Sequence, residues 1–283
     1  MKKKDWISLL LIVLCLGVLA GYQALDNLRT DSVPPQITIA DGLLEASVQD
    51  PRETLLAGVT AVDDVDGNVT GSLVVESVRL LRSDGTVTVT YAAFDKSGNV
   101  AKKTREVFYT DYESPEFSLS RPLLFPQNVN YDVLSIISAS DMLDGDISHR
   151  IRATVLDEVE AGYSGTHHVQ FRVTNNLGET VELVLPVEVY TPGVFEAKME
   201  LTDYLIYLEK GDTFDAKRYL KEFSLGRDTI SIQGGVTDKM ELKVSGLVRA
   251  NIPGVYEVNY EIRYTVSEQI YTAYSKLIVV VEG

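Results

Sequence analysis

Cysteine and tryptophan are almost absent from the sequence, with one residue of each, and histidine occurs three times. The single cysteine, Cys15, lies in an apolar N-terminal segment, so the chain after it has no cysteine and cannot form a disulfide framework. The histidines, His149, His167 and His168, have a spacing that fits no zinc motif. We therefore expect the stability of the chain to come from ordinary hydrophobic cores.

Basic residues are also scarce, with 26 lysines and arginines against 41 aspartates and glutamates and a formal net charge of −15. Residues 1–5 hold three lysines and one aspartate and contribute +2, which leaves −17 for the remainder. The phosphates of a nucleic acid would repel a chain of this charge, so we expect no nucleic-acid partner. The carboxylates suit a cation or a basic partner, and they equally suit plain solubility.

Long apolar runs are limited to residues 6–25, which contain no charged residue. About twenty such residues cross a bilayer as a helix, and three lysines before the run orient the N-terminus toward the cytoplasm. We predict a cytoplasmic tail at 1–5, a single-pass signal anchor at 6–25 and a stem linker at 26–34, with the bulk of the chain extracytoplasmic at the cell membrane. Two alternatives stay open, namely secretion after cleavage near Ala20 and a lipoprotein signal at Cys15.

Two blocks of the sequence recur at nearly the same offset. VTAVDDVDGNVT at 59–70 returns 78 residues later as ISASDMLDGDIS. GTVTVTYAAFDKSGN at 85–99 returns 80 residues later as GTHHVQFRVTNNLGE, and a third copy, GVYEVNYEIRYTVSE, occupies 254–268. Two blocks that recur together indicate a tandem repeat of one structural unit.

The second block alternates between apolar and polar residues, which is typical of a strand with one buried face. Valine, threonine, isoleucine and tyrosine dominate it, and helical spacing appears only at 215–223. We predict an all-β chain of tandem Ig-like β-sandwich domains preceded by one N-terminal transmembrane helix. The predicted domains are 35–112, 113–192 and 193–283, the last of them divergent.

The frame VTAxDxxDGN-V-T followed by GTxxVTYxAxDxSGN resembles the bacterial Ig-like domains of group 3 and the related HYR-type modules. The first repeat matches over nearly its whole length, the second has NNLGE in place of DKSGN, and the third lacks the acidic glycine loop. The resemblance implies spacers, adhesive stalks or binding domains on exported proteins, and seldom enzymes.

The acidic loops are the main candidate site. Catalysis is disfavoured because Asp63 and Asp66 lie in a short polar turn where solvent would keep both carboxylates ionised. An EF-hand is excluded because alignment on Gly67 places Val62 and Leu73 at ligand positions. Calcium held between separate loops, and a purely structural role in turns, both remain open.

In an Ig-like path the acidic loop and the loop between the last two strands meet at one pole. Carboxylates that are distant in sequence would then converge, and they repel one another unless a cation compensates. In the second repeat they would face the junction between domains. The candidate calcium ligands are Asp63, Asp66, Asp95, Asp111, Glu113, Asp141, Asp144 and Asp146.

No nucleophile elbow, phosphate-binding glycine loop or cysteine motif occurs, so we expect no catalytic site and no cofactor other than calcium. We predict a non-enzymatic stalk, adhesin or envelope assembly module, anchored in the membrane through residues 6–25, with a protein or glycan partner on the cell surface. The third repeat is the expected partner-binding module. The alternatives are a carbohydrate-binding accessory and a subunit of a surface filament. The first needs an exposed aromatic platform, and the position of the single tryptophan, Trp6, in the apolar N-terminal run argues against it. Tyr204, Tyr207, Tyr271 and Tyr274 would line a binding face only if they are exposed, and packing in a core or at a sheet edge is expected instead.

Overall fold

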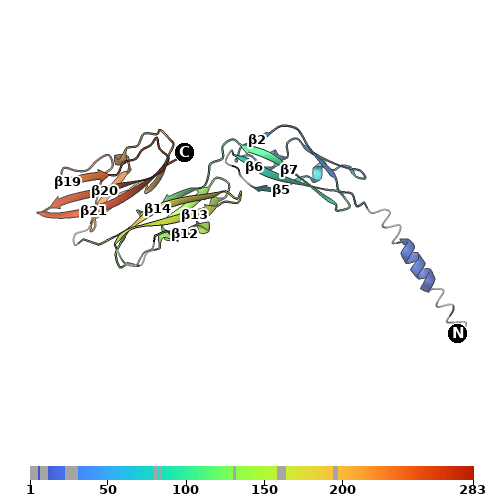
Figure 1. Ribbon diagram of the computed structural model, residues 1–283, viewed down its shortest axis with the longest axis horizontal. Helices are drawn as coiled ribbons and strands as arrows, with labels where there is room; N and C mark the ends of the chain where they lie inside the picture. The colour runs from blue at the N-terminus through green and yellow to red at the C-terminus, as the bar shows by residue number, and fades with distance from the viewer. Residues whose placement is uncertain are drawn as a thin grey trace. The chain divides into compact units, whose positions relative to one another are not determined.

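The chain is described by a computed structural model that covers residues 6, 12–22, 31–79, 82, 85–129, 132–157, 164–193 and 197–283. It divides into two compact units, Met1–Tyr112 and Glu113–Gly283, whose elements are drawn in Figure 1. From residue 31 onward the regular structure of the described residues consists of strands and short 3-10 helices. The predicted all-β sandwich architecture is confirmed.

The N-terminal part of the chain is described only in places. Residues 12–22 form a helix, drawn in blue near the N-terminus in Figure 1. The predicted tail at 1–5, most of the remaining anchor and residues 26–30 of the predicted stem lie outside the described residues. Within the described ranges, no helix has both the length and the apolar character needed to cross a membrane.

Unit 1 contains one β-sandwich, called here the first sandwich. Its strands are β1 (Gln36–Ile39), β2 (Leu44–Ala46), β3 (Val59–Asp63), β4 (Gly67–Asn68), β5 (Val74–Arg79), β6 (Thr86–Phe94) and β7 (Val100–Tyr109). One sheet has the order β1-β3-β4 and the other β2-β7-β6-β5. β2 pairs with β7 in parallel, whereas β1 pairs with β3 antiparallel, so the first extended segment contributes to both sheets.

Unit 2 contains a second and a third sandwich with the same plan. The strands of the second are β8 (Glu116–Leu119), β9 (Leu124–Pro126), β10 (Ile137–Asp141), β11 (Gly145–Asp146), β12 (Arg152–Val155), β13 (Gly165–Thr174) and β14 (Thr180–Tyr190). The strands of the third are β15 (Lys198–Leu201), β16 (Leu205–Leu208), β17 (Leu220–Leu225), β18 (Asp228–Ser231), β19 (Met240–Ser245), β20 (Gly254–Val266) and β21 (Gln269–Val281). The sheet orders are β11-β10-β8 with β12-β13-β14-β9, and β15-β17-β18 with β16-β21-β20-β19.

Short 3-10 helices connect several strands. They are η1 (Arg52–Leu56), η2 (Thr70–Ser72), η3 (Val133–Ser135), η4 (Ser148–Arg150) and η5 (Ala216–Tyr219). The helical spacing at 215–223 corresponds only to η5, because β17 begins directly after it. The Asp215 carboxylate starts η5 by accepting a hydrogen bond from the amide of Lys217.

The alternating pattern places one face of each long strand in a core. In β6, Val87, Val89 and Tyr91 are 1%, 0% and 0% exposed, as the alternation predicts. The buried Tyr91 hydroxyl donates a 2.7 Å hydrogen bond to the carbonyl of Leu55, which fastens η1 to the core. The Tyr256 hydroxyl donates to the carbonyl of Ile252 at 2.8 Å, the backward contact of a tyrosine corner.

Candidate functional site

The acidic loop of the first sandwich is built around Asp63, the last residue of β3. Its Oδ1 accepts hydrogen bonds from the amides of Val65 (2.9 Å) and Asp66 (2.8 Å). Gly67 then adopts a φ of 72°, a left-handed conformation that glycine tolerates without strain. One carboxylate oxygen of Asp63 is therefore used to close the turn.

The loop between β6 and β7 is built around Asp95. Both of its carboxylate oxygens accept hydrogen bonds from Asn99, Oδ1 from the backbone amide (2.8 Å) and Oδ2 from Nδ2 (2.6 Å). The next residue, Lys96, reaches across to the acidic loop, where its amide donates to Asp66 Oδ2 at 2.7 Å and its Nζ lies 3.0 Å from Asp66 Oδ1. The two loops therefore meet at one pole of the sandwich.

Three carboxylates converge at this pole. One oxygen each from Asp31, Asp63 and Asp95 lies within 4.8 Å of the other two. Asp31 is held by the amide of Val33, which donates to its Oδ1 at 2.9 Å, and by Asn99 Nδ2, which donates to its backbone carbonyl at 3.1 Å. The end of the predicted stem thus lies against the first sandwich.

Two oxygens of this cluster lack a hydrogen-bond donor. Asp63 is only 4% exposed, and its Oδ2 and the Oδ2 of Asp31 are buried without a partner among the described residues. The nearest lysine in the loop, Lys96, pairs with Asp66 instead. Buried carboxylates that face one another without a donor are unfavourable unless a positive charge compensates them.

A calcium ion fits this arrangement. Calcium binds six to eight oxygens at about 2.3–2.6 Å, so oxygens on opposite sides of the ion are up to about 5 Å apart. The spread of 4.8 Å among the three carboxylates lies within this limit. Asp31, Asp63 and Asp95 would hold the ion with water completing its shell, and the ion would supply structural positive charge rather than reaction chemistry.

The second sandwich has the same loop with one decisive difference. Asp141 Oδ1 accepts hydrogen bonds from the amides of Leu143 and Asp144, both at 2.9 Å, as Asp63 does in the first sandwich. At the position that corresponds to Asp95 the chain has Asn175, whose Nδ2 donates to Asp141 Oδ2 at 3.0 Å. This amide compensates the Asp141 oxygen that corresponds to the unpartnered oxygen of Asp63.

Two further predicted calcium ligands, Asp66 and Asp144, pair with residues of the neighbouring loops. Hydrogen bonds from the amide and ammonium of Lys96 hold the pKa of Asp66 below its usual value. Asp144 accepts two hydrogen bonds from Asn176, both at 2.7 Å, and pairs with Arg150 at 3.1 Å.

The remaining three predicted ligands also have local roles. The Ser148 hydroxyl lowers the pKa of Asp146, and the Ser47 hydroxyl lowers that of Asp111 within unit 1. Glu113 follows the boundary between the units, and its backbone amide contacts the sulfur of Met142 at 3.2 Å. None of these three belongs to a carboxylate cluster in the part of the chain that the structure describes.

Sequence reasoning missed Asp31, although a signal for it exists. The offset of 80 that relates the two loop sequences also relates Thr30-Asp31 to Thr110-Asp111. The prediction places Asp31 in the stem because the first predicted domain begins at residue 35. Extending the repeat backward by this offset would have added Asp31 to the candidate ligands.

No family model matches the sequence, and no curated protein matches it. Among solved structures, the chain is similar to CBM51-2 and INT domains of ZmpB from Clostridium perfringens, at 18% identity over 59% of this chain and 31% of that one, with a TM-score of 0.22. It is also similar to Drosophila N-cadherin EC1-4, at 15% identity over 89% of this chain and 67% of that one, with a TM-score of 0.21. The chain spans less than two thirds of the first solved structures that it matches.

Proposed function

We propose that the chain is a non-enzymatic, extracytoplasmic Ig-like repeat protein whose first sandwich binds calcium through Asp31, Asp63 and Asp95. The observation that carries this proposal is that Asp63, whose buried Oδ2 has no donor in the described chain, belongs to a cluster with two further carboxylates. Because Asp31 precedes β1, the ion would fasten the entering segment to the loops of the sandwich. The protein then acts as a stalk or adhesin whose first sandwich is stabilised by a bound cation.

The sequence supports an extracytoplasmic location for this stalk. Residues 6–25 form an uncharged apolar run preceded by three lysines, the pattern of a signal anchor. Calcium sites of extracellular modules require calcium concentrations of the order of 0.1–1 mM, which occur outside the cytoplasm. A reporter fused after residue 283 tests the topology, since an extracytoplasmic reporter is expected and a cytoplasmic one contradicts the anchor.

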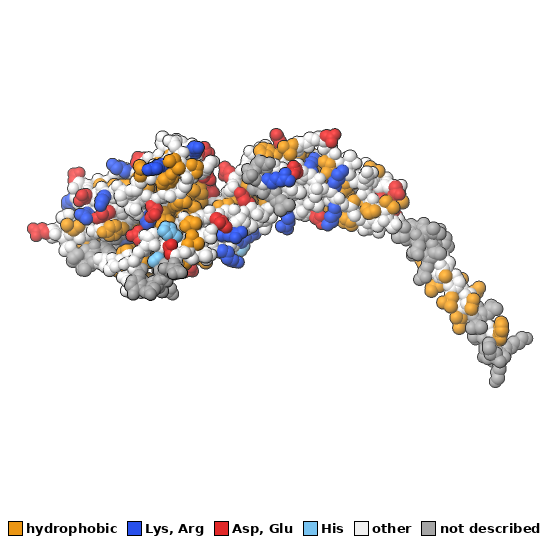
Figure 2. Space-filling model, in the orientation of Figure 1, with side chains coloured by type: hydrophobic (Ala, Val, Ile, Leu, Met, Phe, Trp, Pro, Cys, Tyr) orange, Lys and Arg blue, Asp and Glu red, His pale blue; other side chains and the backbone are white. Residues whose placement is uncertain are grey.

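The remaining surface agrees with a non-enzymatic role. The carboxylates at the pole accept amide hydrogen bonds inside turns, an arrangement that builds loops rather than a substrate cleft. Figure 2 shows Asp and Glu side chains spread over the visible face of each unit and interspersed with Lys and Arg. Mixed charge of this kind favours solubility over attraction of one polyanion.

Thermal unfolding of the full chain tests the calcium proposal. We expect calcium to raise the melting temperature of the transition that involves unit 1, because a ligand that binds only the folded state stabilises it by about 2.7 kcal/mol at a concentration of 100 Kd. Excess chelator should reverse the shift, and magnesium should give a smaller one because it demands tighter octahedral geometry. An unchanged melting temperature in millimolar calcium would contradict the proposed calcium site. If lowering the pH raised the melting temperature instead, a proton rather than a cation would compensate the carboxylate cluster.

A further inference from the structure

A groove runs between the second and third sandwiches, inside unit 2. It consists of two cavities of about 410 Å³ and about 600 Å³. Leu124, Tyr190 and Tyr274 line both cavities, so the two cavities adjoin. Cavities of roughly 300–1,000 Å³ are typical of small-molecule sites.

The two walls of the groove are fixed relative to each other. Lys276 on β21 is 2% exposed and pairs with Glu188 on β14 at 2.9 Å and with Glu257 on β20 at 2.7 Å. The amide of Phe117 on β8 donates a 2.9 Å hydrogen bond to the Tyr207 hydroxyl on β16. These contacts between the sandwiches hold the groove open in a preformed state, which reduces the entropy lost on binding.

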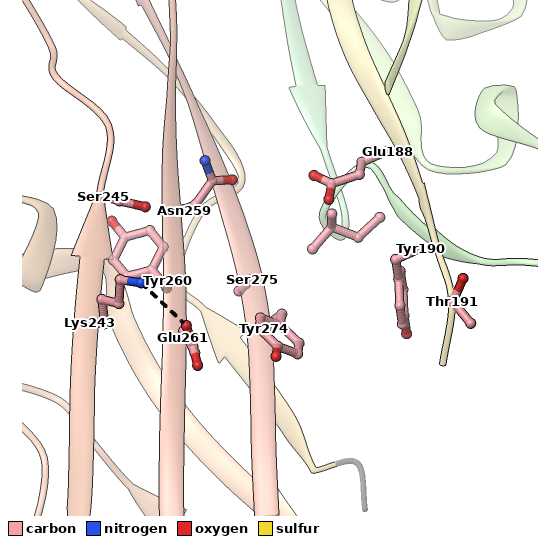
Figure 3. Close-up of a pocket in the computed structure, with 11 residues that line it drawn as sticks. Glu188, Tyr190, Thr191, Lys243, Ser245, Asn259, Tyr260, Glu261, Tyr274 and Ser275 are labelled. Atoms are coloured by element: carbon pink, nitrogen blue, oxygen red, sulfur yellow. Dashed lines mark ion pairs between the residues drawn. The ribbon is translucent and has the colours of Figure 1, made fainter. Parts of the chain in front are cut away.

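Two tyrosines flank the first cavity. Figure 3 shows Tyr190 on the wall formed by the second sandwich and Tyr274 on the wall formed by the third. Tyr274 is 55% exposed, so its ring is available to a ligand. A tyrosine offers a flat apolar face together with a hydroxyl, which matches a sugar ring with its apolar C–H face and polar rim.

Neutral polar groups surround these rings. Thr191, Ser245 and Asn259 line the same cavity and supply hydroxyl and amide donors and acceptors. The acids of this cavity are already paired, since Glu188 contacts Lys276 and Glu261 lies 2.8 Å from Arg263. The first cavity therefore presents hydrogen-bonding groups without an uncompensated charge.

The second cavity has a positive excess. Arg121 and Lys198 line it and have no ion-pair partner among the described residues, whereas its acid Glu200 pairs with Lys221 at 3.0 Å. Two cations thus line one cavity of a chain whose net charge is −15. These two cations could pair with an anionic group of a ligand that is bound in the first cavity.

We infer that this groove binds a short acidic oligosaccharide, with one sugar ring between Tyr190 and Tyr274 and a carboxylate directed toward Arg121 and Lys198. The paired acids and neutral groups of the first cavity select sugar hydroxyls, and the free cations of the second select the acid. This site is independent of the calcium cluster in the first sandwich, so either can fail without the other.

Calorimetric titration of the full chain with short oligogalacturonates and with the neutral galacto-oligosaccharides of equal length tests the inference. The acidic oligomers should bind about tenfold more tightly than the neutral ones in about 50 mM NaCl, and the difference should shrink in about 500 mM NaCl because salt screens the charges. Tyr274→Ala should weaken binding of both by about tenfold or more, whereas Tyr274→Phe keeps the stacking face and most of the affinity. The double variant Arg121→Gln/Lys198→Gln should lose only the preference for the acid.

Ile270→Ala is the matched control, because Ile270 is 50% exposed on the same strand and lies outside both cavities. It should leave the affinity unchanged, and unchanged melting temperatures establish that each variant is folded. The inference is overturned by absence of binding at about 5 mM of every oligomer, by equal affinity for acidic and neutral oligomers, or by full affinity in Tyr274→Ala. Displacement of the sugar by a hexaglutamate peptide at equal affinity would assign the groove to acidic peptides instead.

Discussion

Asn175 donates a 3.0 Å hydrogen bond from Nδ2 to Oδ2 of Asp141, at the place where the first sandwich sets Asp95 beside Asp63. The two pairs occupy equivalent positions in their own sandwiches. Each acidic loop has the same hydrogen bonds from backbone amides to the aspartate and a glycine with a positive φ. The second sandwich neutralises the buried aspartate with an amide. The first adds more carboxylates, which is the arrangement that a cation stabilises.

The substitution Asp95→Asn converts the first site to the arrangement of the second. Removing one charge and adding a donor for Asp63 should raise the calcium-free stability by about 1–2 kcal/mol and abolish the response to calcium. Chemical denaturation with chelator and with calcium measures both effects. Asp64→Asn, at an exposed position of the same loop, should leave the calcium response intact; a calcium response that survives Asp95→Asn contradicts the assigned ligands.

The reciprocal substitution Asn175→Asp should destabilise the second sandwich. It replaces the donor to the buried Asp141 with a like charge, and a buried acceptor without its donor costs about 1–3 kcal/mol. Urea unfolding in chelator measures the loss. If the variant is as stable as the parent chain, the amide at this position has no role in compensating Asp141.

Lys276 should be essential to the contact between the second and third sandwiches. Lys276→Met removes the cation between Glu188 and Glu257 and should destabilise unit 2 by about 1–3 kcal/mol, since two carboxylates then lose the cation that pairs with both. The matched control is Lys243→Met, because its ammonium is exposed and lies 3.9 Å from Glu261. Because the Lys243 side chain is 71% exposed, that pair should contribute less than about 1 kcal/mol. Equal effects of both variants on urea unfolding would argue against a stabilising role of Lys276.

Alkaline pH should weaken unit 2 through Tyr207. Burial raises the pKa of Tyr207 to about 12 from a usual value of 10.0, so the folded state keeps a proton that the unfolded state releases. The stabilising contribution is complete below pH 10 and is lost as the pH rises toward 12. Tyr207→Phe should therefore reduce the dependence of the melting temperature on pH in this window.

Measurements near neutral pH separate this effect from the lost hydrogen bond. There Tyr207→Phe should cost about 1 kcal/mol because the amide of Phe117 loses its acceptor. Burial also raises the pKa of Tyr260 in unit 2, so this tyrosine keeps part of the alkaline dependence. A variant whose dependence on pH matches that of the parent chain would show that Tyr207 does not titrate in this window.

Alternation along β6 and β13 and the recurring blocks were sufficient to predict tandem sandwiches, because both signals are local and repeat with the fold. They also indicated that the acidic loop and the β6–β7 loop share a pole, since that follows from strand order. The partners of each carboxylate could not be derived in this way. Asp66 and Asp63 are three residues apart, yet one pairs with Lys96 and the other faces Asp31 and Asp95.

The sequence by itself determined the all-β class, the recurring loops and the lack of disulfides. Only the tertiary structure decided which acids remain uncompensated and which tyrosines line a groove. Tyr274 is exposed and lines a cavity with Tyr190, whereas Tyr207 is half-buried and accepts a hydrogen bond from the second sandwich. The physical reason is that periodicity reports which face of a strand is buried. Hydrogen bonds, ion pairs and cavities depend on side chains from distant strands, and their positions are set only when the sandwiches pack.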